Sequence, residues 1–307
     1  KVSITYNMGI SNPLISIIVP FRNRERYIQR SLASFRRIKY RPIELIFVDN
    51  ASEDQSREFV EHFFHDIVGK DVATILLTEP TIGVCKARNY GLHAAHGDFV
   101  YFFDDDDEIS ADFLDDALPY LHNNDIVAAP TLMIFPTGVA KVRYTSFSDR
   151  VRDQILTGML STQSMLIRKS ALISAGEWNE KLPKWNDWEL GVRLLKKGLK
   201  ITWLKKAYHR IHQHPDSLTG PSLATTYSLL QPALLAVASL SLTDSEKRAL
   251  AAKELIISRE LEKAGEKQQS SAIKTRNLKL YPSLFLLCCY LRLIDRGAWR
   301  FYRTFWL

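Results

Sequence analysis

The sequence predicts an α/β protein with a mostly parallel sheet flanked by helices and a helical C-terminal extension. Short apolar segments alternate with segments of helical spacing over residues 14–103, an order that favours a parallel sheet covered on both faces. The most apolar of these segments is followed directly by four aspartates, and beyond Gly220 the strand pattern stops. With 307 residues, 46% of them apolar, the chain is long enough for one large domain or two smaller ones.

The first predicted elements form a strand, a helix and a second strand. Residues 14–19 are an apolar run that should form a buried strand ending at Pro20. Residues 24–36 have helical spacing, with their apolar side chains on one side. Residues 43–48 form the next apolar run, and it ends at Asp49.

A helix, a strand, a helix and a strand follow in that order. Ser52 and Gln55 have the spacing of a capping box, which predicts a helix to about residue 65. The next strand, helix and strand are predicted at residues 74–77, 84–95 and 99–103. Ligands of such sheets bind beyond the carboxyl ends of the strands. Because Asp49 and Asp104 both stand at strand ends, we expect the site at this rim.

The four aspartates at residues 104–107 carry the strongest chemical signal. Like charges a few ångströms apart repel each other, and burial raises the cost, so a cation, a proton or a cationic ligand is expected there. The spacing of Asp104 and Asp106 suits one divalent cation whose other ligands come from a diphosphate. The alternative is a solvated acidic loop.

The second half of the chain has weaker strand signals and ends in helices. A helix and a strand are predicted at residues 187–197 and 200–204, followed by a histidine-rich loop. Thr243 and Glu246 form a second capping box, which opens a helix to about residue 263. The polar residues 265–271 suggest a linker before a last helical, aromatic segment. We therefore expect a catalytic domain at residues 1–220 and a helical region at residues 221–307.

Charge and cysteine content restrict the environment of the protein. Residues 273–307 carry six of the seven net positive charges. The basic pI of the protein therefore comes mainly from this segment. No nucleic-acid recognition motif accompanies it, and we expect no nucleic-acid partner. Cys85, Cys288 and Cys289 do not suggest a disulfide framework, which favours a reducing, cytoplasmic compartment. No signal peptide is visible, but a lost leader stays open because the chain starts at Lys1.

The C-terminal segment allows two interpretations. Its longest apolar run, residues 281–291, is too short for a transmembrane helix of roughly 20 residues. Its arginines fall on one side of a helical wheel among aromatic residues, which suits a peripheral contact with an anionic membrane at the inner face of the plasma membrane. The alternative is a helix that packs on the enzyme or on a second subunit, as in a homo-oligomer. The arginines concerned are Arg292, Arg296, Arg300 and Arg303.

Five segments in order along residues 14–217 resemble the motifs of family 2 inverting glycosyltransferases of the GT-A fold. They are SIIVPFRNRE at residues 16–25, ELIFVDNASED at 44–54, IGVCKARNYGL at 82–92, GDFVYFFDDDD at 97–107 and WNDWEL at 185–190. Each segment alone is a weak signal, but five in the family's order are specific. The resemblance implies a GT-A-type sheet and transfer of a hexosyl group.

The resemblance also assigns roles to individual residues. It implies that Asp106 meets a Mn²⁺ or Mg²⁺ ion, with His212 beside it and His214 as the alternative, and that Asp187 is the catalytic base. The alternative for the cluster of His209, His212 and His214 is a surface loop without a role at the site. Trp185 and Asn186 would lie on the acceptor side. The implied nucleotide-binding residues are Pro20, Arg22, Asp49, Gly83, Arg88, Asp104 and Asp105, of which Asp49 and Arg88 would face the base. Lys86 is a further candidate for a phosphate contact or for a solvated helix face.

The implied reaction explains these residue types. A sugar nucleotide carries a diphosphate leaving group, and a divalent cation stabilises its departing charge as a Lewis acid. The acceptor hydroxyl must lose a proton, which a carboxylate within hydrogen-bond reach can take. One base and a direct attack invert the sugar carbon. We expect a nucleotide-diphospho-sugar donor, UDP-linked by default, and a glycan or lipid-linked acceptor in polysaccharide biosynthesis.

The chain departs from the family pattern at four positions. Arg22 stands where an aromatic residue is common, Asn50 and Ala51 replace an acid and a glycine, and Asn186 replaces the usual Glu before Asp187. Asp187 is then the sole candidate base, and a helix N-terminal acid is its alternative role. A nucleotidyltransferase or a non-catalytic sugar-nucleotide-binding module are the alternative functions.

Overall fold

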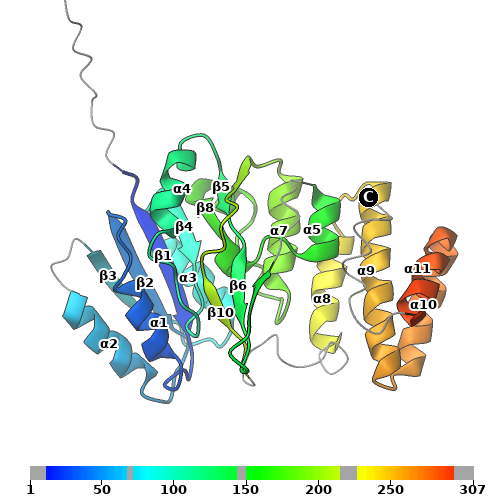
Figure 1. The fold of residues 1–307 in the computed structure, drawn as a ribbon, viewed down its shortest axis with the longest axis horizontal. Helices are drawn as coiled ribbons and strands as arrows, with labels where there is room; N and C mark the ends of the chain where they lie inside the picture. The colour runs from blue at the N-terminus through cyan, green and yellow to red at the C-terminus, as the bar shows by residue number, and fades with distance from the viewer. Residues whose placement is uncertain (1–11, 68–71, 144–149, 215–226, 294–307) are drawn as a thin grey trace, which may run out of the picture.

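The computed structural model describes residues 12–67, 72–143, 150–214 and 227–293. A seven-stranded sheet with the order β3-β2-β1-β4-β8-β5-β9 forms the centre, and a three-stranded sheet with the order β10-β6-β7 lies beside it. Helices flank the large sheet, and α8 to α11 stand in a row at the end opposite β3 and α2 (Figure 1). The predicted α/β class with a mostly parallel sheet and a helical C-terminal region is confirmed.

The N-terminal half of the sheet is parallel, and all of its strands except the edge strand are buried. It contains β1 (Ile15–Phe21), β2 (Ile43–Asp49), β3 (Val72–Thr78) and β4 (Phe99–Phe102). β1 pairs in parallel with β2 on one side and with β4 on the other, so the carboxyl ends of these strands share one rim, as predicted. Every residue of β1 and β2 is buried, which is typical of parallel strands covered on both faces. β1 continues through Pro20 to Phe21, past the predicted end.

The C-terminal half of the sheet is built from shorter strands of mixed direction. β5 (Ile126–Ala128) pairs antiparallel with β8 (Met165–Arg168) and parallel with β9 (Ile201–Trp203). β8 also pairs antiparallel with β4. This half therefore breaks the parallel pattern of the first.

The small sheet brings the histidine-rich loop to the aspartates. β6 (Thr131–Ile134) pairs antiparallel with β7 (Ala140–Arg143) and parallel with β10 (Arg210–His212). A backbone bridge joins Glu108 to Arg210, with the Glu108 N–H donating to the Arg210 carbonyl at 3.0 Å. Residues 102 positions apart in the chain thus lie side by side at the rim.

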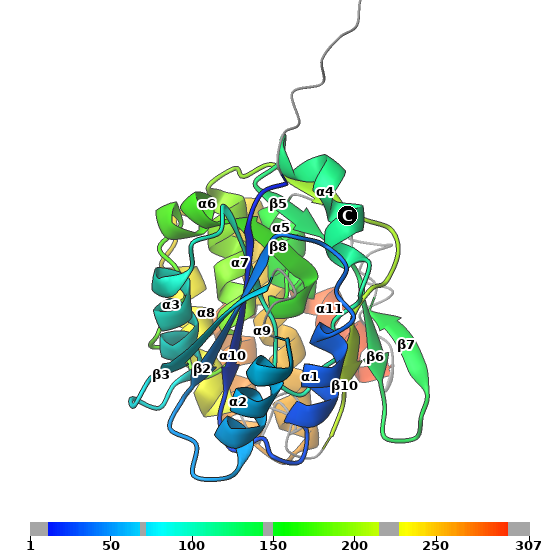
Figure 2. The same ribbon diagram turned by 90° about the vertical axis from the view of Figure 1, so that its left-hand side faces the viewer.

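Two groups of helices cover the two faces of the sheet. On one face Leu32 and Val60 of α1 and α2 pack with Ile17 of β1, and on the other Leu92 of α3 packs with Ile18. Figure 2 shows α3 on one side of the sheet and α1 and α2 on the other. The helices in this part of the chain are α1 (Ile28–Phe35), α2 (Ser56–Ile67), α3 (Val84–Ala94), α4 (Phe113–Leu121), α5 (Val151–Thr157), α6 (Lys169–Ser174) and α7 (Asn186–Lys196), with a 3-10 turn η1 (Thr162–Ser164).

Two predicted helix starts are wrong. α1 begins at Ile28, because residues 24–27 form turns. α2 begins at Ser56, and Ser52 does not cap it: the Ser52 hydroxyl accepts from the Asn23 N–H at 3.2 Å. Asp54 accepts from the Ser56 N–H at 3.0 Å instead, so an aspartate side chain satisfies a first-turn donor.

The C-terminal helices share a core with the strands and helices of the preceding part of the chain. They are α8 (Tyr227–Ala238), α9 (Asp244–Lys263), α10 (Lys267–Leu280), the 3-10 turn η2 (Pro282–Leu284) and α11 (Phe285–Leu293). The capping box of Thr243 and Glu246 is confirmed. The predicted linker is wrong, because α10 starts at Lys267 after a turn at Gly265 with φ +90°. The division expected at residue 220 lies outside the described residues.

That shared core runs from the sheet to α9. Leu255 and Ile257 of α9 belong to the same apolar cluster as Ile18 of β1 and Val100 of β4. Burial of such side chains contributes roughly 25 cal/mol per Å² of apolar surface, so α9 is bound to the body by its core contacts. Within the part of the chain that is described, we find no helix long and apolar enough to cross a membrane.

Candidate active site

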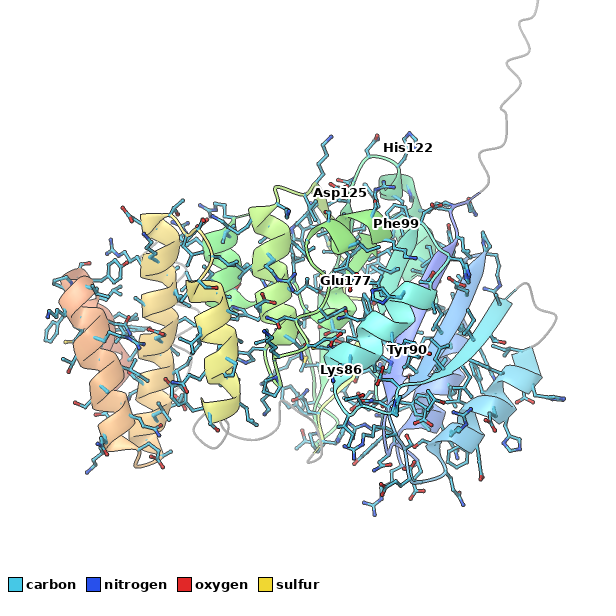
Figure 3. The ribbon with its side chains drawn as sticks, turned by 180° about the vertical axis from the view of Figure 1, so that it is seen from behind. Lys86, Tyr90, Phe99, His122, Asp125 and Glu177 are labelled. Atoms are coloured by element: carbon cyan, nitrogen blue, oxygen red, sulfur yellow. The ribbon has the colours of Figure 1, made fainter. Side chains whose placement is uncertain are left out.

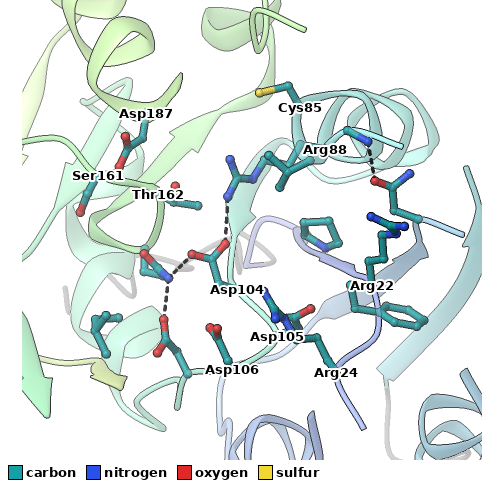
Figure 4. Close-up of a pocket in the computed structure, with 18 of the residues that line it drawn as sticks. Arg22, Arg24, Cys85, Arg88, Asp104, Asp105, Asp106, Ser161, Thr162 and Asp187 are labelled. Carbon is teal, nitrogen blue, oxygen red and sulfur yellow. Dashed lines mark hydrogen bonds and ion pairs between the residues drawn. The ribbon is translucent and has the colours of Figure 1, made fainter. Parts of the chain in front are cut away.

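A cavity of about 940 Å³ opens at the carboxyl ends of β1 and β4. The end of β1, the start of α3, the aspartate run, η1, the start of α7 and β10 all contribute to its wall. Figure 4 shows Asp187, Ser161 and Thr162 on one side of Asp104 and Arg22 and Arg24 on the other. The lining includes these residues that the sequence assigned to the site: Pro20, Arg22, Gly83, Arg88, Asp104, Asp105, Asp106, Asp187 and His212.

Three carboxylates of the aspartate run are held by two different arginines and by one shared amide. Asp104 accepts from Arg88 at 2.9 Å, and Asp105 forms an ion pair with Arg24 at 3.1 Å. The amide of Gln163 donates to Asp104 at 2.5 Å and to Asp107 at 2.7 Å, as the dashed lines in Figure 4 show. One side-chain amide therefore joins the first and last carboxylates of the run.

Burial and mutual repulsion raise the pKa values of three carboxyl groups in the run. Burial raises the pKa of Asp104, and Arg88 opposes this effect. Burial and the neighbouring Asp106 raise the pKa values of Asp105 and Asp107 well above the usual range. Asp104, Asp105 and Asp107 therefore bind protons more readily than exposed aspartates, and a cation would favour their charged forms.

The two histidines of β10 and the following loop face different carboxylates. His214 Nε2 lies 2.9 Å from Asp106 Oδ2, and its ring stacks on Tyr27 at 4.1 Å. His212 Nε2 lies 2.8 Å from Glu108, while the His212 backbone N–H donates to Asp107 at 2.7 Å. The geometry brings His214, the alternative ligand, to Asp106. The role of His212 beside a cation stays a prediction.

The carboxylates at the cavity fit a cation whose remaining ligands come from a substrate. Over the described residues, no group of three or more His, Cys, Asp or Glu side chains could hold a metal by itself. Mg²⁺ in phosphate-transfer sites is commonly held by one or two carboxylates plus substrate phosphates, and Mn²⁺ likewise prefers oxygen ligands. Asp106 and Asp104, which face the cavity together, provide such a pair.

The end of β2 presents Asn50, not Asp49, to the cavity. Asp49 is 5% exposed, accepts from the Ser52 N–H at 2.9 Å and pairs with Arg57 at 3.4 Å. Asn50 lines the cavity and accepts from the Gly83 N–H at 2.8 Å. Its amide donates to the carbonyls of two residues in the same loop, Glu79 and Thr81. Asn50 thus fixes the loop that leads into α3.

Arg88 joins the aspartate run to the segment that leads into α7. Its side chain is 5% exposed. Its guanidinium lies 4.3 Å from the ring centroid of Trp178 and donates both to Asp104 and, at 3.1 Å, to the amide oxygen of Asn186. A Glu at position 186 would place a second carboxylate on Arg88, whereas Asn186 supplies a neutral acceptor. Asn186 and Trp185 lie behind the cavity wall, because neither is part of its lining.

Asp187 faces the cavity from the N-terminus of α7. It accepts from the Trp188 N–H at 2.8 Å and leaves carboxylate surface open to the cavity. Trp185, two residues earlier, has a left-handed backbone with φ +56°. By contrast, Lys86, whose helix α3 is seen from behind in Figure 3, is not among the lining residues, which favours the solvated helix face.

A buried chain of hydrogen bonds that the sequence did not reveal positions Gln163. His209 is fully buried, and burial lowers its pKa to about 3, so the ring is neutral. Its Nδ1 accepts from the Ser110 N–H at 3.2 Å, so Nε2 donates to the Tyr101 hydroxyl at 2.7 Å. Tyr101 donates in turn to the Gln163 carbonyl at 2.6 Å. The only sequence signal for these hydrogen bonds was the histidine-rich motif, and that motif suggested a surface loop.

The sequence also did not predict two cationic side chains in the cavity wall, Arg24 and Arg143. Arg24 belongs to the quoted segment at residues 16–25, but no spacing rule singled it out. Arg143 ends the short strand β7, and no motif includes it. Cys85, the first of the three cysteines, is buried. Burial raises the pKa of Cys85, which lines the cavity, to about 11, so this thiol is protonated at neutral pH.

A mostly parallel sheet with an acidic run at its central strand end and a carboxylate across the cavity is the arrangement of GT-A glycosyltransferases. The family model "Glycosyl transferase family 2" matches residues 16–175, and the chain belongs to this family. The predicted family is thereby confirmed.

Curated relatives support this membership over part of their length. The chain is 40% identical over 116 residues to an uncharacterized glycosyltransferase of Haemophilus influenzae, covering 38% of this chain and 45% of that protein. It is 33% identical over 116 residues to the poly(ribitol-phosphate) β-N-acetylglucosaminyltransferase TarS of Staphylococcus aureus, covering 36% and 20%. The chain thus spans less than half the length of these relatives.

Solved structures share the fold. S. aureus TarS 1–349 in complex with UDP-GlcNAc has a TM-score of 0.61 at 23% identity, covering 78% of this chain and 71% of that chain. The mannosyltransferase PcManGT from Pyrobaculum calidifontis, in complex with GDP-Man and Mn²⁺, has a TM-score of 0.61 at 16% identity, covering 96% and 84%. At these identities the likeness concerns the fold.

Proposed function

We propose that this protein is a metal-dependent inverting glycosyltransferase that moves a sugar from a nucleotide-diphospho-sugar to a hydroxyl group of a glycan or lipid-linked acceptor. The observation that carries the proposal is the cavity itself. It has the aspartate run on one side and Asp187 on the other, and Arg88 ties the two sides together through Asp104 and Asn186.

The donor nucleotide would occupy the half of the cavity next to β1 and α3. Pro20, Arg22, Asn50 and Gly83 line this half, and the Arg22 guanidinium can stack on a base. Asp105, paired with Arg24, would face the ribose side. In this arrangement Asp49 supports the turn after β2.

The diphosphate would lie over Asp104 and Asp106. A Mn²⁺ or Mg²⁺ ion bound there with Asp106 as a ligand would supply Lewis-acid stabilisation of the leaving group. Arg88 holds Asp104 in place with a charge-assisted hydrogen bond. Gln163 prevents Asp104 and Asp107 from moving apart, because its amide donates to both.

Asp187 is the proposed general base. The acceptor oxygen attacks the anomeric carbon while the Asp187 carboxylate takes the hydroxyl proton. The bond between that carbon and the diphosphate oxygen breaks, and its electron pair leaves with the nucleoside diphosphate. A single displacement inverts the anomeric carbon, so the two-carboxylate geometry of glycoside hydrolysis does not apply.

A UDP-sugar is the proposed donor. Among the structures of similar fold, TarS 1–349 is in complex with UDP-GlcNAc in one case and with UDP in another, and PcManGT is in complex with GDP-Man and Mn²⁺. These neighbours support a nucleotide-sugar donor and a divalent ion. Relatives named for teichoic acid synthesis support a surface-polymer acceptor.

We further propose a cytoplasmic location with a peripheral contact through residues 273–307. In the described part of this segment Leu280, Phe285 and Leu286 are each more than half exposed, which suits a membrane surface or a second subunit. Arg296, Arg300 and Arg303 lie outside the described residues. Sedimentation with anionic vesicles, with and without residues 273–307, tests the membrane contact, and equal binding of both forms would contradict it.

Product analysis tests the reaction. We expect the protein with Mn²⁺ to release nucleoside diphosphate from one member of a nucleotide-sugar panel in the presence of acceptor, and Asp187→Ala and Asp106→Ala each to abolish this release. Asp66→Asn, at an exposed ion pair on α2, is the matched control and should retain activity. Pyrophosphate as product would indicate a nucleotidyltransferase. Metal-dependent nucleotide binding without turnover would indicate a non-catalytic module.

A further inference from the structure

We infer that Lys253, in the C-terminal helix α9, is a positioning residue for the segment that carries Asp187. The inference rests on the proposed function and extends it, since it gives the helical C-terminal region a part in the transfer reaction. None of the motifs at residues 14–217 includes this lysine.

Lys253 is buried at the contact between α9 and the catalytic body. Only 6% of its surface is exposed, and its ammonium donates to the Leu156 carbonyl at the end of α5 at 3.2 Å. The same ammonium lies 4.8 Å from the ring centroid of Trp185 and 5.7 Å from that of Trp188. A lysine is rarely buried so fully, because its charge loses hydration, and contacts with indole rings and a carbonyl offset that loss.

The two tryptophans, Trp185 and Trp188, lie on either side of Asp187 in the sequence. Trp185 precedes α7, and its left-handed backbone with φ +56° is unfavourable for a residue with a side chain. Such a conformation persists only where surrounding contacts determine it. The Trp185 and Trp188 rings pack at 5.3 Å, and the Trp188 indole N–H donates to the Ile155 carbonyl at 3.0 Å. Lys253 therefore contacts both rings of a constrained turn.

That turn sets where Asp187 points. Asn186, which follows Trp185 directly, holds Arg88, and Asp187 faces the cavity from the next position. If Trp185 relaxed to an ordinary backbone conformation, the first residues of α7 would reorient. A displacement of about 1 Å in a reacting group can cost roughly a hundredfold in rate. The nucleotide-binding side would change less, because it is built mainly from β1, α3 and the aspartate run, and its one link to this segment is the hydrogen bond from Arg88 to Asn186.

Charge supports the same role. Burial and, to a smaller extent, Arg143 lower the pKa of Lys253 to about 7, and Asp187 opposes this shift. Asp187 is thus close enough for its charge to favour the ammonium form. The lysine acts on the base through the tryptophans and through this field, and it does not line the cavity where the substrates would bind.

The test compares Lys253→Met, which keeps the length of the side chain and removes its charge, with Lys253→Arg and with Lys247→Met. Lys247 is on the same helix, and its side chain is 53% exposed. We expect Lys253→Met to lower kcat for transfer at least tenfold, while its Kd for UDP with Mn²⁺ stays within about twofold of the wild type. Lys253→Arg should recover part of kcat, and Lys247→Met should match the wild type.

A double substitution separates positioning from general support of the fold. If Lys253 acts through the base, Lys253→Met should have no further effect on the residual rate of Asp187→Asn, since residues that act as a unit are strongly non-additive. A tenfold loss in both backgrounds, or a Kd for UDP that weakens in step with kcat, would overturn the inference. So would a folded Lys253→Met protein with wild-type kcat. Absence of transfer by the wild-type protein would refute the proposed function instead.

Discussion

The two halves of the cavity are built differently. The half proposed to bind the donor nucleotide stands on long, fully buried parallel strands, β1 and β2, whose neighbours in the sheet are set by a regular register. The half proposed to bind the acceptor stands on three- and four-residue strands, short helices and a helix from the C-terminal region. Its polar side chains are positioned by contacts between segments far apart in the chain, such as Lys253 with Leu156.

The difference has a physical consequence. A buried parallel sheet resists local change because each strand is fixed on two sides, so one substitution at its end alters mainly the contact it removes. Short elements depend on a few long-range hydrogen bonds, and the loss of one can move several groups together. Substitutions at the joint between the halves should therefore have the largest effects.

Arg88 is that joint, and we expect the largest loss for Arg88→Met. It removes hydrogen bonds to Asp104 and Asn186, and bonds of this charged type contribute about 1.5–3 kcal/mol each. We predict a fall in kcat/KM of roughly a thousandfold, measured as nucleoside diphosphate release.

The matched control is Arg168→Met. Arg168 also lies over an aromatic ring, 4.6 Å from the centroid of Phe99, but outside the cavity lining. It should change kcat/KM less than threefold. Similar losses in both variants, with both proteins folded by circular dichroism, would mean that the joint has no special role.

Gln163→Leu should have the next largest effect. The substitution keeps the approximate size of the side chain but removes the amide shared by Asp104 and Asp107. A buried acceptor that loses its donor costs about 1–3 kcal/mol, so we predict a roughly 10- to 100-fold lower kcat and a higher Mn²⁺ concentration for half-maximal activity. A titration of rate against Mn²⁺ measures both. An unchanged titration curve would show that Gln163 does not organise the aspartate run.

The buried ammonium of Lys253 should appear in the pH dependence of stability. Because burial lowers its pKa from the usual 10.5 to about 7, the unfolded chain holds a proton between these values that the folded protein has released. The free energy of unfolding therefore rises with pH in this window, by about 1.4 kcal/mol per pH unit for a single group. Below pH 7 both states are protonated and the effect on the slope vanishes.

Comparison with Lys253→Met isolates this contribution. Arg143 on β7 and Asp187 on α7 face the lysine, and both stay in the variant. Urea unfolding from pH 6 to pH 9 should give a wild-type stability that gains about 2–3 kcal/mol over the variant above pH 7. Parallel curves over the whole range would show that Lys253 keeps an ordinary pKa.

The same contrast between the halves explains what the sequence could predict. Continuous apolar runs such as those of β1 and β4 mark buried parallel strands, and their carboxyl ends predicted the rim at which the cavity opens. The strands β5 to β8 are too short to show a period, and their neighbours are determined by tertiary pairing, so no element was predicted between residues 108 and 186. Gln163 and Lys253 act through partners that only the folded chain brings together. His209 looked like a surface residue because its loop is polar in sequence, yet it is buried against Tyr101.

The smallest predicted effect concerns the end of β2 and decides between two adjacent residues. The family resemblance assigns the base contact to Asp49, but its carboxylate is occupied by Ser52 and Arg57, outside the cavity lining. We therefore expect Asp49→Asn, which keeps the shape and the acceptor oxygen, to weaken UDP binding less than about threefold.

Asn50→Ala removes three hydrogen bonds that fix the loop before α3. Each of these neutral bonds contributes about 0.5–1.5 kcal/mol, so UDP binding should weaken roughly tenfold. Calorimetric titration with UDP and Mn²⁺ measures both constants. The reverse order of effects would mean that Asp49 turns into the cavity when the nucleotide binds, and that the donor half is less rigid than its parallel strands suggest.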